Sequence, residues 1–147
     1  MVSASVWAQT TDAKFYKDAV RKVDMYCLHN GKASIKKNQD FKRVYSQGKY
    51  AADPMLVAYA LANGVGVNRL GITVSKKIGC AVVRNRVRRW IKESYRLLPN
   101  ILEGQAAISY DIVFIARAPA GKLIGKGSFN QINKSVKALL VRLEKKL

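Results

Sequence analysis

Apolar residues recur at helical spacing at both ends of the region that follows residue 33. The first of these helices is predicted to begin at Asn38-Gln39-Asp40 and to end at Gly48. The last is predicted to run from the capping box Ser128-Phe129-Asn130-Gln131 to the end of the chain. Its apolar stripe is interpreted as core and consists of Phe129, Ile132, Val136, Leu139, Leu140 and Leu143.

The first helix carries a short apolar face formed by Phe41, Val44 and Tyr45. Val44 is interpreted as a core residue. The two aromatic side chains lie four residues apart, which leaves two interpretations open. Both rings could pack against the core, or one could stay partly exposed as a surface on which bases stack.

Alternating or fully apolar runs between these helices predict strands. Residues 55–61 and 69–75 alternate, the second with Leu70, Ile72 and Val74 on one side. The turn signal Asn63-Gly64-Val65-Gly66 lies between the two runs and predicts a hairpin. Residues 110–116 are apolar on both faces and too short for a helix, which predicts a central strand.

Residues 84–98 are predicted to form a helix with an apolar face and a cationic face. The apolar residues fall in one arc of about 120° on a helical wheel: Val87, Trp90, Ile91, Leu97 and Leu98. Cations follow one another at intervals of four residues: Arg84, Arg88, Lys92 and Arg96. Like charges at this spacing repel, and Glu93 is the only acid in the stretch. The cationic face is therefore interpreted as a surface that binds a polyanion rather than as an ordinary solvated face.

The charge of the whole chain narrows the class of partner. Its 147 residues include 27 Lys and Arg against nine Asp and Glu, a formal net charge of +18. Nucleic acid is favoured over a membrane surface, because the cationic face belongs to a globular pattern and no apolar run approaches the roughly 20 residues of a membrane span. With two cysteines and no secretory signal, the expected location is the cytoplasm.

The sequence contains no evident catalytic constellation. The single histidine, His29, and nearby Cys27 do not have a metal-ligand spacing. The nine acids include no pair spaced for acid–base or two-metal chemistry. No catalytic residue is assigned, and the chain by itself is interpreted as a binder.

The predicted order of elements from residue 34 is α-β-β-β-α-β-α, an α+β fold of the α-β sandwich type. The helix over 84–98 joins strands 69–75 and 110–116 in a β-α-β unit, so these two strands are expected to be parallel. The general rule for such units predicts a right-handed crossover.

One motif resembles a known family. Lys76-Lys77-Ile78-Gly79, followed after a short gap by Arg84-Asn85-Arg86-Val87-Arg88-Arg89, closely resembles the signature of the bacterial ribonuclease P protein subunit. The resemblance extends over roughly residues 35–143 and implies a left-handed crossover instead of the right-handed one. It also implies a function in removing the 5′ leader from precursor tRNA, where the catalytic RNA carries the Mg²⁺-dependent hydrolysis. The protein would bind that RNA and the single-stranded leader, and would strengthen metal and substrate binding. The implied partners are the ribonuclease P RNA and precursor tRNA, with no membrane and no small-molecule substrate.

The resemblance also implies two sets of binding residues. The residues implied to bind the RNA subunit are Lys76, Lys77, Arg84, Asn85, Arg86, Arg88, Arg89 and Lys92. The residues implied to line a leader-binding cleft are Phe41, Tyr45 and Tyr59. Metal-binding positions stay unassigned. Two roles are left open for Asn85, reading a groove edge or capping a local backbone group, and Trp90 is either core or rim.

Residues 1–33 lie outside the resemblance and are expected to be an extension to a domain over 34–147. A helix in this extension, an unstructured tail and upstream sequence from a mistaken start codon are all open. Two other functions are weighed against the subunit role. One is a ribosomal or general RNA-binding protein, and the other is a self-sufficient nuclease, which would need a carboxylate or histidine cluster.

Overall fold

The computed structural model describes residues 33–98, 108–123 and 127–147, and the alternatives left open for the N-terminal extension fall outside these ranges. The elements, in chain order, are β1 (Ala33–Ser34), α2 (Asn38–Gln47), β2 (Lys49–Ala52), β3 (Leu56–Ala62), β4 (Arg69–Val74), η1 (Lys76–Ile78), α3 (Ala81–Leu97), β5 (Tyr110–Ala116), α4 (Ala118–Gly121) and α5 (Ser128–Glu144). The α+β class is confirmed. The sequence did not locate β1, β2, η1 or α4, all of which have four residues or fewer.

The strands form one mixed sheet in the order β1-β4-β5-β3-β2. β5 is parallel to β4 and antiparallel to β3, so the predicted parallel β4-α3-β5 unit is present. The handedness of its crossover stays a prediction.

The predicted hairpin between residues 55–61 and 69–75 is wrong, because β5 lies between β3 and β4. The turn residues at the end of β3 bond to the start of β5 instead of closing a hairpin. The Asn63 backbone N–H donates to the Ser109 carbonyl oxygen at 2.9 Å, and Asn63 Nδ2 donates to Asp111 Oδ1 at 2.7 Å. A strand that is apolar on both faces is best buried at the centre of the sheet, and β5 takes that place. β3 forms its hairpin with β2 instead, as an antiparallel pair.

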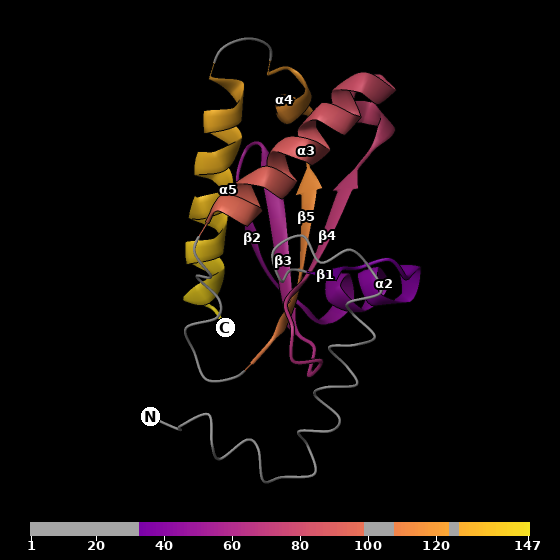
Figure 1. Cartoon of the computed structure of the whole chain (residues 1–147), viewed down its shortest axis with the longest axis vertical. Helices are drawn as coiled ribbons and strands as arrows, with labels where there is room; N and C mark the ends of the chain where they lie inside the picture. Colours follow the sequence, from indigo (N-terminus) through magenta and orange to yellow (C-terminus); the bar gives the residue numbers. More distant parts are fainter. Residues whose placement is uncertain (1–32, 99–107, 124–126) are drawn as a thin grey trace, which may run out of the picture.

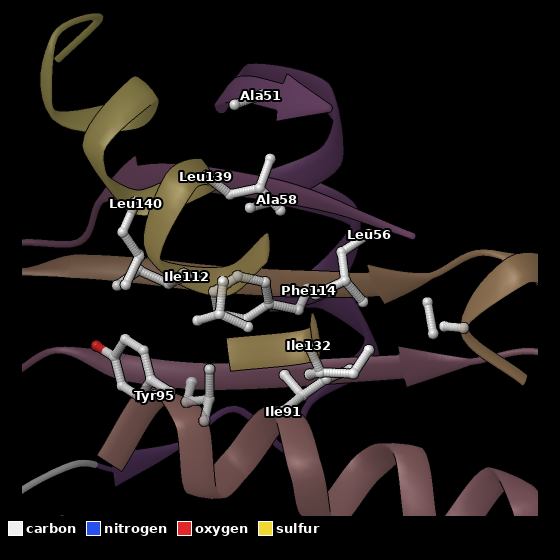
Figure 2. Packing of buried hydrophobic residues seen from close by; sticks show 14 of the residues in the cluster. Ala51, Leu56, Ala58, Ile91, Tyr95, Ile112, Phe114, Ile132, Leu139 and Leu140 are labelled. Carbon is white, nitrogen blue, oxygen red and sulfur yellow. The ribbon is translucent and has the colours of Figure 1, made fainter. Parts of the chain in front are cut away.

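Helices cover both faces of the sheet (Figure 1). On one face, α3 and α5 pack against the main core, in which Leu56, Ile91, Phe114, Ile132 and Leu139 are fully buried. Figure 2 shows this packing, with Phe114 from β5 between the side chains of the two helices. On the other face, α2 lies over a smaller cluster whose buried residues are Ile35, Val44 and Val113. Alternate residues of β5 thus serve both cores, which explains its continuous apolar run.

Helix α3 buries Val87 and Ile91 as predicted, together with Ser94 and Tyr95. Leu97 was predicted in the apolar arc but is 56% exposed. The buried face of α3 includes Tyr95 at one edge, and Leu97 therefore lies beyond the opposite edge of this face. Trp90, at that same edge, is partly buried and packs against the core.

Helix α5 buries the predicted stripe from Ile132 to Leu143. The predicted capping box is wrong by one position, because Gly127 is the N-cap and Ser128 is already helical. Gly127 has a φ of 97°, a left-handed conformation that glycine adopts without steric cost, and no side chain caps this end.

Helix α2 begins and ends where predicted, but Gly48 is needed for space and not for a left-handed turn. Its φ is −73°, and a Cβ at this position would lie 2.4 Å from the Val44 carbonyl oxygen.

The C-terminal end of α5 reaches the edge strand β2. Arg142 Nη1 donates to the Ala52 carbonyl oxygen at 2.9 Å, and Lys146 Nζ donates to the Tyr50 carbonyl oxygen at 2.8 Å. Both carbonyls belong to alternate residues of β2 and point away from β3. Lysine and arginine at an exposed edge protect it from pairing with another strand.

Candidate RNA interface

The cationic residues predicted from the motif form one continuous stretch of η1 and α3, called here the basic surface. Lys76 and Lys77 are exposed on η1, and Arg84 is half-buried near the start of α3. The other members are exposed along α3: Asn85, Arg86, Arg88, Arg89 and Lys92. In the described parts of the chain, no carboxylate forms a salt bridge with any cation of this surface. These charges are therefore available to an external anion.

One hydrogen bond joins two members of the basic surface. Asn85 Oδ1 accepts a hydrogen bond from Arg88 Nη1 at 3.3 Å, a role that differs from the two left open by the sequence. Arg84 Nε is buried and has no hydrogen-bond partner among the described residues. Glu93 pairs with Arg96, and this hydrogen bond lowers the pKa of Glu93.

The start of α3 carries an exposed thiol beside the basic surface. Cys80 is the N-cap residue of α3 and is exposed. No side-chain hydrogen bond closes the cap, but the backbone N–H groups of Val83 and Val82 lower the pKa of the thiol, with a smaller contribution from Arg84. The positive end of the helix favours a thiolate in the same way as it favours other anions.

The three predicted aromatic residues come together on the other face of the sheet, between α2 and β3. The ring centroids of Phe41 and Tyr45 are 6.3 Å apart, and those of Tyr45 and Tyr59 are 5.4 Å apart. All three side chains are half-buried. Tyr45 Oη forms a hydrogen bond with Thr73 Oγ1 at 2.8 Å, which holds its ring over β4. This group, called here the aromatic surface, therefore combines fixed rings with partial exposure.

The Phe41 ring packs closely against the sheet at Gly71. A Cβ atom at Gly71 in β4 would lie 2.7 Å from Phe41 Cε1 and 3.1 Å from Val113 Cγ2. Glycine at this position lets the Phe41 ring lie directly on the strand. A hollow of about 600 Å³ lies elsewhere, beside Asp53 and Arg117, and contains none of the predicted site residues.

A fourth aromatic residue adjoins this surface and was not predicted. Tyr50 is 57% exposed, and its ring centroid is 5.8 Å from that of Tyr59. The two residues face each other across the β2–β3 pair. The residue pattern does not reveal β2, so the cross-strand register that brings the two rings together could not be predicted from the sequence.

One guanidinium fixes α2 against the sheet beside the aromatic surface. Arg69 donates to both oxygens of Asp111, at 2.6 and 2.5 Å, and to Asp40 Oδ2 in α2 at 3.2 Å. Asp111 is fully buried, and Asn63 donates to it as well. The hydrogen bonds to Asp111 raise the pKa of Arg69. This network connects α2, β4 and β5, and it was not predicted from the sequence.

The basic and aromatic surfaces lie on opposite faces of the sheet and approach each other at one end of β4. Gly71 and Thr73 of β4 face α2, whereas Leu70 and Val74 face the main core. Lys76 follows Thr73 after two residues, as β4 passes into η1. A polyanion could therefore bind at both surfaces by passing around this end of the strand.

Some kinds of site are not found in the described ranges. Residues 33–98, 108–123 and 127–147 contain no group of three or more His, Cys, Asp or Glu that could hold a metal ion. No helix within the same ranges is long and apolar enough to cross a bilayer.

Comparison with known proteins decides the family. The family model described as Ribonuclease P matches residues 30–144, most of the chain and all of both surfaces. The chain belongs to the ribonuclease P protein family. This confirms the resemblance on which the two residue sets were based.

The match covers most of the length of the named relatives. The ribonuclease P protein component of Caldanaerobacter subterraneus subsp. tengcongensis is 50% identical over 107 residues, which are 72% of this chain and 84% of that protein. The component from Clostridioides difficile is 47% identical over 115 residues, which are 78% of this chain and 95% of that protein.

Solved structures of the ribonuclease P protein agree with the fold. The Staphylococcus aureus protein matches with a TM-score of 0.60 and 36% identity, over 74% of this chain and 93% of that one. The Thermotoga maritima protein matches with a TM-score of 0.60 and 28% identity, over 78% and 96%. Because the chain belongs to the ribonuclease P protein family, it is part of an endoribonuclease complex. The family also favours the RNA-binding subunit of ribonuclease P over a ribosomal or general RNA-binding protein.

Proposed function

We propose that this chain assists a catalytic ribonuclease P RNA in removing the 5′ leader from precursor tRNA in the bacterial cytoplasm. The observation that carries the proposal is the basic surface, a cationic stretch of η1 and α3 on which no described carboxylate forms a salt bridge. Its members on α3 are mostly arginines, whose planar guanidinium groups bind phosphate through two parallel hydrogen bonds. This surface would bind the RNA subunit.

The aromatic surface would bind the single-stranded leader. Phe41, Tyr45 and Tyr59 are held by packing and by the bond from Tyr45 to Thr73, yet each is partly exposed. Stacking on unpaired bases is worth ~1–3 kcal/mol per base and requires no particular sequence. That tolerance suits an enzyme that processes many different precursors.

The hydrolysis is assigned to the RNA and to Mg²⁺ bound with it. The carboxylates nearest the aromatic surface, Asp40 and Asp111, are both bonded to Arg69 and do not fit as ligands of a further cation. The protein's part is to neutralise phosphates and hold the substrate. Denser local positive charge would also let the RNA fold and bind substrate at a lower Mg²⁺ concentration.

The test is cleavage of a precursor tRNA at low Mg²⁺ by a bacterial ribonuclease P RNA, with and without this protein. We expect leader release only when both components are present. Cleavage by the protein alone would support the self-sufficient nuclease. Tight RNA binding without any effect on a competent ribonuclease P RNA would support a general RNA-binding protein.

A further inference from the structure

Tyr50 is an exposed aromatic residue at the edge of the sheet, in the strand farthest from β4 and β1. It is the most exposed aromatic side chain among the described residues, with 57% of its surface open. Its ring is tilted by 33° against that of Tyr59, with centroids 5.8 Å apart. Tyr50 therefore continues the row of rings that begins at Phe41 in α2.

Lys146 places a positive charge next to the Tyr50 ring. Its Nζ atom lies 5.3 Å from the Tyr50 ring centroid, within the range of a cation–π contact. An exposed ring beside a lysine side chain is a combination by which proteins bind single-stranded nucleic acid, with the base on the ring and the phosphate beside the cation.

Protection of the sheet edge explains Lys146 but leaves the tyrosine side chain unexplained. Lys146 bonds to the backbone carbonyl of residue 50, a contact that any residue at this position could offer. Tyr50 belongs to neither core cluster of the described residues, and more than half of the residue is exposed with Tyr59 and Lys146 in place. Neither edge protection nor core packing therefore explains why an exposed tyrosine continues the row of aromatic rings.

We propose that Tyr50 and Lys146 form a further nucleotide subsite. It binds one unpaired nucleotide of an RNA strand in addition to those bound by the aromatic surface. The base stacks on the open part of the Tyr50 ring, and its phosphate lies beside Lys146 Nζ. The inference rests on the proposed function, in which the aromatic surface binds the leader. The RNA subunit lies at the β4 end in that arrangement, and β5 and β3 separate β4 from β2. Tyr50 therefore takes the leader nucleotide farthest from the cleavage site.

The test measures the affinity of the assembled holoenzyme for precursor tRNAs whose leaders grow one nucleotide at a time, with mature tRNA as the reference. The variants are Tyr50→Ser and Tyr50→Phe, of which the second keeps the ring. For the wild type, we expect affinity to rise with leader length to a plateau. Tyr50→Ser should reach its plateau one nucleotide earlier and bind the longest leaders about fivefold more weakly. It should bind short leaders and mature tRNA as the wild type does, and Tyr50→Phe should match the wild type throughout.

The lysine is tested by salt dependence, with Lys137→Gln, from the exposed face of α5, as a matched control. Lys146→Gln should lower the slope of log Kd against log salt by about 0.7 for long leaders only, and Lys137→Gln should leave it unchanged.

A Tyr50→Ser plateau equal to the wild type, or an equal loss on mature tRNA, would overturn the subsite. Phe41→Ala with Tyr45→Ala separates this failure from failure of the proposed function. If that pair keeps the full gain from leader length, the leader role of the whole aromatic surface is wrong.

Discussion

At the scale of single residues, Arg69 has the largest structural role near the candidate site. Its guanidinium bonds to Asp111 in the centre of the sheet and to Asp40 in α2. The two carboxylates differ in burial, because the Asp111 side chain is fully buried and that of Asp40 is 22% exposed. Their contributions to stability should differ accordingly.

Asp111→Ala should lower the free energy of unfolding by about 3–5 kcal/mol, because it leaves Arg69 and Asn63 without their buried partner. Asp40→Ala should cost about 1 kcal/mol or less, because Arg69 keeps Asp111 and the lost pair is partly exposed to solvent. Urea denaturation of the two variants measures both values. Similar losses would contradict the importance assigned to burial.

Gly71 controls the position of the Phe41 ring. Gly71→Ala would place a methyl group 2.7 Å from Phe41 Cε1, so the ring must move and the free energy of unfolding should fall by about 1–3 kcal/mol. Urea denaturation measures this loss. The matched control is Gly71→Ala in a Phe41→Ala background, where the close contact with the ring is gone and the one with Val113 Cγ2 remains. The substitution should cost less there, and additive losses would show that the two residues do not interact.

At the scale of elements, the sequence predicted the long periodic ones and missed those whose position depends on distant contacts. Helices α2, α3 and α5 and strands β3, β4 and β5 follow from residue patterns within each segment. The hairpin prediction failed because pairing of β3 with β5 depends on bonds between residues almost fifty positions apart, such as Asn63 to Asp111. Leu97 was misplaced because helical periodicity gives an apolar arc but not its exact limits against a particular sheet.

The first turn of α3 makes Cys80 a probe of the basic surface. Backbone N–H groups at this end lower the pKa of the Cys80 thiol, so more thiolate exists at a given pH than in the unfolded chain. In a Cys27→Ser background, the midpoint of the alkylation rate against pH should therefore be lower for the folded protein than in urea. Bound ribonuclease P RNA should slow the reaction by covering this turn. A midpoint equal to that in urea would contradict the role of the helix end.

Helix α3 should dominate the salt dependence of RNA binding. Arg84→Ala with Arg88→Ala should weaken binding to the ribonuclease P RNA and reduce the slope of log K against log salt by about 0.7 for each lost phosphate contact. The control removes the same charge from α5 through Lys134→Ala with Lys137→Ala, both exposed. Filter binding over a salt series would show the difference. Equal slopes for the two pairs would mean that net charge alone drives binding.

At the scale of the whole molecule, the sheet separates two surfaces with different chemistry. Strand register decides this separation, because it sets which residues of β3, β4 and β5 face α2 and which face α3 and α5. The residue types at both surfaces could be predicted from the motif and the aromatic spacing. Their placement on opposite faces, the addition of Tyr50 and the Arg69 network could not be, because each depends on strand register.

The central claim is that these surfaces have separate tasks, and one set of measurements tests it directly. It compares the affinity of the protein for ribonuclease P RNA with the preference of the holoenzyme for precursor over mature tRNA. Arg84→Ala with Arg88→Ala should weaken RNA binding and leave the preference of the assembled holoenzyme intact. Phe41→Ala with Tyr45→Ala should abolish the preference and leave RNA binding intact. If both pairs lower both quantities to the same extent, the two surfaces do not have separate tasks.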